Sequence, residues 1–292
     1  ETKVDEETIE DNFFDYSKVV VKKPWGYEYL IYQNNVVAVW ILYIKSGFQT
    51  SMHCHPNKKT SLVVLAGEVI CYTLNKKMKR FPGDGLLIQK SVFHSTKSIS
   101  DGGSFVMEIE TPINKRDLIR LEDKYGREGK GYETVESMSF NLQNYNYISL
   151  IDSKVFYNVK KKFGKCSISL ARFRNYHKLK DVLNSKKDDV ISILKGKILD
   201  KNKKVILSVG DTMDIKQINA HNGAHIDSEI EAIVIKEIDN IIKVSDYVVS
   251  FFEKNMVKKI FLVPGSANVH LLDSVGRNTN IEHICTQTEQ AA

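Results

Sequence analysis

Three histidines carry the clearest chemical pattern in this sequence. His53 and His55 lie two residues apart, and His94 follows downstream. Residues at positions i and i+2 of a strand point to the same face of a sheet, and a third from a neighbouring strand can complete a facial set of metal ligands. We therefore expect the three to bind a divalent metal. Two alternatives stay open: a metal-free pocket that uses histidines as acid, base or hydrogen-bond donor, and histidines with only a structural role.

The segments around these histidines have the pattern of a β domain. From residue 18 to 112, short apolar or alternating runs are separated by turn residues, which predicts an antiparallel sandwich or barrel. Residues 1–17 read as an acidic N-terminal extension. Residues 113–145 are charged and contain several glycines, so we expect a short helix followed by a turn within a linker.

A second β-rich block, residues 146–238, repeats features of the first. Its Leu194-Lys195-Gly196 echoes Leu65-Ala66-Gly67, and its Val209-Gly210-Asp211 echoes Pro82-Gly83-Asp84. These correspondences predict a degenerate internal repeat. The block has no His-x-His pair, and His177, His221 and His225 stand apart. We therefore expect the second block to pack against the first without forming a second metal centre.

The spacing of Gly47, His53, His55, Gly67 and His94 resembles the first and second motifs of the cupin superfamily. The resemblance implies two tandem jelly-roll β-barrels, so the expected fold is mainly β. Thr60 occupies the position of a Glu in the usual motif. Without that carboxylate, the remaining three-His site suits zinc or another borderline divalent ion, with manganese and iron as further candidates.

A second string, Lys22-Lys23-Pro24-Trp25-Gly26-Tyr27-Glu28, resembles the entry to the cupin domain of mannose-6-phosphate isomerases and mannose-1-phosphate guanylyltransferases. This resemblance implies a metal-dependent sugar isomerase or epimerase whose partner is a sugar phosphate or nucleotide sugar. Residues for substrate binding would be Trp25, Lys58 and Lys59, and candidates for the catalytic base are Glu68, Tyr27 and Tyr72. The alternative is an aromatic strand edge beside solvated lysines.

The tail, residues 241–292, changes to an α/β pattern of helix, short apolar strand, Gly turn, helix and strand. It resembles the start of the pyrimidine-binding domain of thiamine diphosphate enzymes of the acetolactate synthase type, cut short within the domain. The resemblance implies that Glu289 contacts the cofactor's aminopyrimidine, only in a full-length protein. Gly83-Asp84-Gly85 lies in an expected β-hairpin turn without a βα context, so we do not expect it to bind the diphosphate.

Composition narrows the remaining function classes. The formal charge of +6 comes from 42 basic and 36 acidic residues in mixed clusters, which argues against nucleic-acid binding. No apolar run approaches the roughly 18 residues of a membrane span. The four cysteines form no Cys-x-x-Cys pair, so we expect reduced thiols and a cytoplasmic protein. A homodimer is a reasonable expectation for a cupin edge.

Two readings of function follow from these resemblances. The first is a metal-dependent sugar-phosphate isomerase or epimerase, in bacterial surface-polysaccharide or unusual-sugar biosynthesis, fused to part of a thiamine diphosphate enzyme. The second is a non-catalytic cupin module that binds a sugar or nucleotide sugar and is attached to a thiamine diphosphate-dependent lyase or decarboxylase. Ligand binding without turnover would distinguish the second reading from the first.

Overall fold

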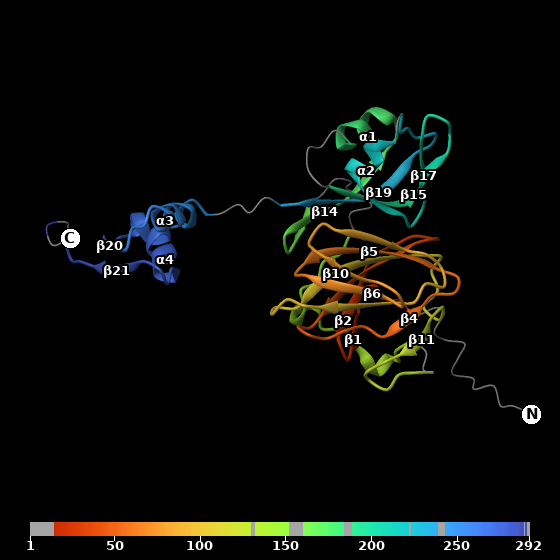
Figure 1. Ribbon diagram of the computed structural model, residues 1–292, viewed down its shortest axis with the longest axis horizontal. Coiled ribbons are helices and arrows are strands. Elements are labelled where there is room, and N and C mark those ends of the chain that lie inside the picture. The colour runs from red at the N-terminus through yellow and green to blue at the C-terminus, as the bar shows by residue number, and fades with distance from the viewer. Residues whose placement is uncertain are drawn as a thin grey trace, which may run out of the picture. The chain divides into compact units, whose positions relative to one another are not determined.

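The computed structural model describes residues 15–129, 132–151, 160–183, 189–221, 223–238, 243–288 and 290. The chain forms two compact units, residues 1–238 and 239–292. The first unit holds two β domains, coloured red to yellow and green to cyan in Figure 1, and the second is a small α/β unit. The mainly β fold with an α/β tail is therefore confirmed.

The first domain is a jelly roll of two antiparallel sheets, the cupin fold. Strand order is β12-β1-β2-β3-β10-β5-β8 in the larger sheet and β11-β4-β9-β6-β7 in the smaller one. The strands are β1 (Val20–Lys23), β2 (Gly26–Gln33), β3 (Ala38–Ile44), β4 (Met52–Cys54), β5 (Lys59–Ala66), β6 (Val69–Thr73), β7 (Lys77–Arg80), β8 (Gly85–Ile88), β9 (His94–Ser98), β10 (Ser104–Thr111), β11 (Ile119–Glu122) and β12 (Met138–Ser139). Short 3-10 helices span Val135–Ser137 and Leu142–Asn144.

Side-chain alternation along β5 divides the domain into two cores. Leu62 and Val64 pack inside the barrel, whereas Val63 and Leu65 belong to the core on the other face of the larger sheet. Successive side chains of a strand point to opposite faces, so each run of apolar residues serves both cores. The same alternation determines which predicted site residues reach the barrel interior.

Two glycines of the recognised motifs allow close backbone contacts. A Cβ at Gly26 would lie 1.9 Å from the Tyr43 carbonyl oxygen, and one at Gly67 would lie 2.5 Å from the Gly103 carbonyl oxygen. Gly67 also has φ of +72°. Only glycine avoids both the clash and the backbone strain at such a position. These residues therefore fix how β2 approaches β3 and how β5 turns into β6.

The segment expected to be a linker, residues 113–145, is part of the first domain. Its β11 pairs with β4, and its β12 pairs with β1. The Asp117 carboxylate accepts hydrogen bonds from the backbone N–H groups of Asn57 and Lys58, at 2.9 and 2.8 Å from the same oxygen. The charged residues of this segment are largely paired against the barrel. Composition alone does not show such pairing, so it predicted a solvated linker.

The second domain is a reduced version of the same fold. Its five-stranded sheet has the order β13-β14-β19-β15-β18, and a separate hairpin pairs β16 with β17. The elements are β13 (Lys160–Phe163), β14 (Cys166–Phe173), α1 (Tyr176–Leu183), β15 (Val190–Lys195), β16 (Ile198–Leu199), β17 (Val205–Leu207), β18 (Thr212–Asp214), α2 (Ile215–Ala220) and β19 (Ile230–Glu237). The Asp214 side chain caps α2 by accepting from the Lys216 N–H.

Matching backbone hydrogen bonds confirm the internal repeat. In the first domain, Gly83 N–H donates to Val64 O and Val64 N–H donates to Asp84 O, at 2.8 and 3.1 Å. In the second, Gly210 N–H donates to Ile193 O and Ile193 N–H donates to Asp211 O, at 2.8 and 3.0 Å. The expected turn at Gly83-Asp84-Gly85 is observed. It does not close a hairpin, because it connects β7 of the smaller sheet to β8 of the larger one.

The two β domains pack through the outer face of the larger sheet. Val63, Leu65 and Ile109 share one core with Ile168 and Ile233 of the second domain. At the edge of this contact, Lys59 Nζ lies 2.7 Å from an Asp211 carboxylate oxygen, and the Ser61 hydroxyl donates to Gly210 O at 2.8 Å. Burial of the apolar residues stabilises the pair of domains as one unit.

The α/β unit contains α3 (Val244–Lys254), β20 (Lys259–Leu262), a 3-10 helix at Ser266–Asn268, α4 (Val269–Arg277) and β21 (Glu282–Cys285). Strands β20 and β21 are parallel. Val249, Leu262, Val275 and Ile281 form its small core. Glu289, predicted to contact thiamine diphosphate, lies outside the described residues.

Candidate metal centre

The structure brings the three predicted histidines together inside the first barrel. His53 on β4 pairs directly with His94, the first residue of β9, and His55 follows β4. Ring centroids are 4.4 Å apart for His53 and His94 and 5.0 Å apart for His53 and His55. One ligand nitrogen from each ring lies within 4.8 Å of the other two. Their spacing is suitable for three ligands of one metal ion.

Backbone carbonyl groups fix the orientation of all three imidazoles. Each Nδ1 faces a carbonyl oxygen that can only accept, so each Nδ1 carries the hydrogen and each Nε2 keeps its lone pair. The Nε2 atom of His55 is buried and has no hydrogen-bond partner. A metal ion bound by the three imidazoles would give this buried nitrogen the partner that it lacks. The accepting oxygens are those of Ser51 for His53 at 2.8 Å, Asp117 for His55 at 2.6 Å and Val92 for His94 at 3.0 Å.

Burial keeps these imidazoles neutral. Desolvation, followed by nearby Lys58, lowers the pKa of His55 to about 3, and desolvation lowers the pKa of His94 to about 4. The pKa of His53 lies well below its usual value because of burial and the two neighbouring rings. Metal ions bind the neutral imidazole, so no proton has to be displaced at neutral pH. The residues present therefore fit a divalent ion.

In the part of the chain that the structure describes, no carboxylate joins the histidines in place of the Glu that the usual motif has at position 60. Thr60 is buried, and its hydroxyl has no hydrogen-bond partner. Among the described residues, the three histidines are the only group of His, Cys, Asp or Glu close enough together to hold an ion. Glu28 and Glu108, two carboxylates that could have compensated for Thr60, line the cavity without joining that group.

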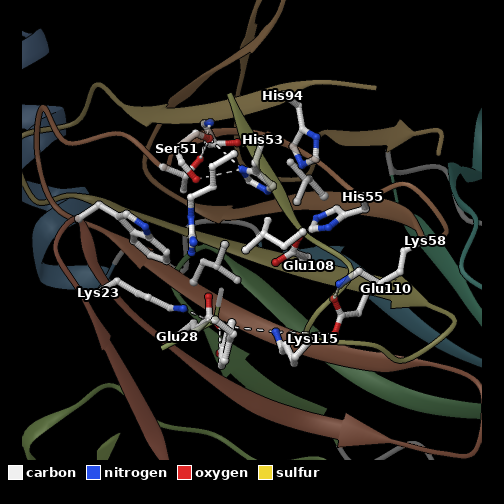
Figure 2. Close-up of a pocket in the computed structure, with 18 of the residues that line it drawn as sticks. Lys23, Glu28, Ser51, His53, His55, Lys58, His94, Glu108, Glu110 and Lys115 are labelled. Carbon is white, nitrogen blue, oxygen red and sulfur yellow. Dashed lines mark hydrogen bonds and ion pairs between the residues drawn. The ribbon is translucent and has the colours of Figure 1, made fainter. Parts of the chain in front are cut away.

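The histidines form one end of an interior cavity of about 70 Å³. Figure 2 shows His53, His55 and His94 together, with Lys23, Glu28 and Lys115 across the cavity from them. Further lining residues are Trp25, Lys58, Glu108, Glu110, Arg120 and Tyr132. A cavity with a histidine end and a charged end can bind a polar ligand in one orientation.

Two of the cavity carboxylates are held by cations. Glu110 lies 2.6 Å from Lys58 Nζ and 3.6 Å from Lys115 Nζ, and it accepts a hydrogen bond from Trp40 Nε1 at 3.1 Å. Burial alone would raise the pKa of Glu110, but these lysines outweigh it and lower the pKa. Lys58 and Glu110 are both only 2% exposed, so the pair is a fully buried salt bridge.

Glu28 forms the second paired carboxylate. Its oxygen lies 3.4 Å from Lys23 Nζ and 3.5 Å from Lys115 Nζ, and it accepts a hydrogen bond from the Tyr132 hydroxyl. Burial opposes ionisation, but Lys23 and Lys115 lower the pKa of Glu28 to about 2. Lys115 also lies over the Trp40 ring, 3.4 Å from its centroid. The charged end of the cavity is therefore a fixed network.

Glu108 is different. Its carboxyl group makes no hydrogen bond and no ion pair with any described residue, although it lines the same cavity and is only 9% exposed. Burial and the adjacent charge of Glu110 raise its pKa to about 7. In Figure 2 it lies between the histidines and the charged end. The motifs that predicted the histidine centre did not identify Glu108 as a site residue.

The residues expected to bind substrate are divided between two places. Trp25 and Lys58 line the cavity, as a substrate-binding role requires. Lys59, the next residue and the first of β5, points instead toward the second domain and pairs with Asp211. The alternation of the strand explains why neighbouring lysines have different surroundings.

The three expected catalytic bases lie outside the cavity. The Glu68 side chain is 41% exposed and pairs with Lys79 at 2.7 Å. Tyr27 packs among Tyr29, Tyr43 and Tyr145 on the outer face of the larger sheet. Tyr72 is a partly exposed residue beside Lys77 and is likewise absent from the cavity lining. None of them is placed to act on a ligand bound at the histidines.

In the described residues of the second domain, no strands correspond to those that carry the histidines in the first. The corresponding stretches, after β14 and after β18, contain α1 and α2. His177 lies in α1, and His221 is the C-terminal cap of α2. His225 is partly exposed beside Leu199. The described residues of this domain contain no grouping of possible metal ligands.

Several lining residues come from the segment expected to be a linker, namely Lys115, Leu118, Arg120, Arg127 and Tyr132. The available sequence signal was the mixture of Arg, Asp, Glu and Tyr residues with apolar Ile and Leu. Solvated linkers seldom need the aromatic and aliphatic residues. That pattern could have indicated a segment packed over the barrel.

Comparison with protein families gives one match. Residues 242–292 match the family model for the N-terminal TPP binding domain of thiamine pyrophosphate enzymes. This confirms the resemblance inferred for the tail. No protein of curated function matches the sequence. No helix in the described part of the chain has the length and apolar character needed to cross a membrane.

The similar solved structures have low sequence identity to this chain and cover only about a third of it. A double-stranded β-helix protein from Klebsiella pneumoniae is 15% identical, with 33% of this chain and 84% of that one covered and a TM-score of 0.31. KdgF from a Halomonas species is 15% identical, with 32% and 84% covered and a TM-score of 0.30. The capsular polysaccharide assembling protein CapF from Staphylococcus aureus is 16% identical, with 36% and 34% covered and a TM-score of 0.32. At this similarity, the fold assignment rests on strand order instead.

Proposed function

We propose that the first domain is a metal-dependent isomerase or epimerase that acts on a sugar phosphate or nucleotide sugar. The observation that carries this proposal is the convergence of three neutral imidazoles, each oriented by a backbone carbonyl, at one end of a polar cavity. Zinc, manganese and iron all suit such ligands. A divalent ion held there would polarise a substrate oxygen as a Lewis acid.

The cavity walls support a role in which this chain orients a sugar. Lys58 is buried near His55 and His94, where its ammonium group would stabilise negative charge on a substrate oxygen. Trp25 offers an apolar surface for a sugar face.

The α/β unit supports a further part of the proposal. Its match to the TPP binding domain favours a full-length protein that uses thiamine diphosphate, with Glu289 at the aminopyrimidine. The presence of both domains in one chain favours a cytoplasmic pathway of unusual-sugar or surface-polysaccharide synthesis in a bacterium, and a homodimer is compatible with it.

The test is a turnover screen of the purified 292-residue chain loaded separately with zinc, manganese and iron. Hexose phosphates and nucleotide sugars are followed by NMR for isomerised or epimerised products. We expect turnover that disappears in His53→Ala and persists in His177→Ala, a matched control outside the cavity. Absence of turnover with every metal would contradict the proposal, and ligand binding without turnover would favour the sugar-binding module.

A further inference from the structure

Three of the described residues that line the cavity carry carboxyl groups, and one of the three has no structural partner among those residues. Glu110 is held by Lys58, Lys115 and Trp40. Glu28 is held by Lys23, Lys115 and Tyr132. Glu108 makes no hydrogen bond or ion pair with any residue that the structure describes. The Glu108 carboxyl group therefore differs from those of Glu110 and Glu28 in having no partner.

An unpaired buried carboxyl group reduces the stability of a folded protein. Burial removes its hydration, and no hydrogen bond or cation compensates. Gln would avoid the charge with almost the same shape. Groups that a fold retains at such a cost are concentrated at functional sites. Here the group lies in the same cavity as the histidine centre.

The position of Glu108 on β10 fixes the direction of its side chain toward the cavity. Val106, two residues earlier, packs inside the barrel, and Glu110, two residues later, also faces the cavity. The strand pairs on both sides, with β3 and with β5, so its backbone is fixed. A carboxyl group on a central strand keeps a defined position relative to a bound ligand.

We propose that Glu108 is the catalytic residue that carries a proton between two substrate carbons at the histidine centre. This inference rests on the proposed function and names the base that it requires. Glu110 and Glu28 cannot do the same without breaking their lysine pairs. Glu68, Tyr27 and Tyr72 lie outside the cavity.

The step balances without an oxidant or reductant. The ionised Glu108 takes a proton from the carbon next to a substrate carbonyl. The C–H electron pair becomes the C=C bond of an enediolate, and the carbonyl oxygen takes the negative charge. The ammonium group of Lys58, which lines the same cavity, would stabilise that charge. Glu108 then returns the proton to the former carbonyl carbon. The proton of the neighbouring hydroxyl group moves to the former carbonyl oxygen, which yields the isomer with its carbonyl group on the adjacent carbon. A pKa raised to about 7 suits a group that must both accept and release a proton near neutral pH.

The experiment compares Glu108→Gln, Glu108→Asp and the wild type, with Glu122→Gln as a control at an exposed position. Metal content is measured first, and solvent deuterium incorporation into a panel of hexose phosphates in D₂O is then followed by NMR. We expect Glu108→Gln to keep its metal and its KM but to lose at least about 100-fold in kcat. Glu108→Asp should recover part of the loss. An exchange rate within about threefold of wild type would overturn the assignment.

A second measurement separates this inference from the proposed function. If no sugar is turned over by the wild type, the isomerase proposal fails, and the melting temperature at pH 8 then decides the role of Glu108. We expect Glu108→Gln to melt at or above the wild-type temperature, because it removes an unpaired buried charge. A decrease comparable to that of Glu110→Gln would show that Glu108 is structural and would overturn the inference.

Discussion

Replacement of Glu110 by Gln should strongly destabilise the first domain. The change leaves the shape of the side chain and an acceptor for Trp40 Nε1, but it removes the negative charge beside Lys58. Lys58 is 2% exposed, so water cannot replace the lost partner. Lys115, 3.6 Å from the same carboxylate, loses one of its two partners as well.

The expected magnitude follows from this burial. Removal of one member of a buried ion pair costs about 3–5 kcal/mol. One kcal/mol corresponds to roughly 2–4 °C for a domain of this size, so the melting temperature should fall by about 6–20 °C. Glu68→Gln breaks an exposed pair with Lys79 and should cost less than about 1 kcal/mol.

Urea unfolding at pH 7 measures both effects. Glu110→Gln combined with Lys58→Met should recover much of the loss, because neither charge then remains unpaired. The pKa of Glu110 is lowered in the folded protein, so its stabilisation is present above the usual Glu range and disappears as pH falls through the folded pKa. The two proteins should therefore converge in acid. A loss below about 1 kcal/mol at pH 7 would refute the reasoning.

Two further predictions concern the glycine turn and the response to acid. Gly67→Ala should cost at least about 2 kcal/mol in urea unfolding, because the new Cβ would lie 2.5 Å from Gly103 O and φ is +72°; an unchanged midpoint would contradict this. In the metal-free protein, His55 and His94 stay neutral down to a pKa of about 3 and about 4, whereas unfolded histidines protonate below about 6.5. The unfolded state then binds more protons, so stability should decrease as pH falls from about 6.5 to 4, and His94→Gln should show a smaller decrease in the same unfolding experiment.

The histidine centre could be predicted from the sequence because the pattern that indicates it is local. Two residues of a strand share a face, and the motif spacing places His94 on the adjacent strand. The same alternation applies at the start of β5, where Lys58 precedes the strand and Lys59 is its first residue. Predicting which of the two lysines faces the cavity requires knowing at which residue the strand begins. Element boundaries depend on tertiary pairing and are therefore poorly determined by sequence.

The charged end of the cavity could not be predicted in this way. Lys115 and Tyr132 come from a segment whose composition is typical of a linker, and their partners Glu28 and Glu110 are distant in sequence. Pairing over such distances depends on how the chain returns to the barrel. For the same reason, Glu108 gave no sign of being the unpaired member of three acidic residues, since only the contacts show it.

Elemental analysis of the purified chain, with and without His53→Ala and His55→Ala together, tests the metal centre most directly. Two of three ligands disappear in the double variant, while the buried lysine and glutamate network is left in place. We predict close to one divalent metal per wild-type chain and almost none in the variant. No metal in either protein, or equal metal in both, would contradict the account.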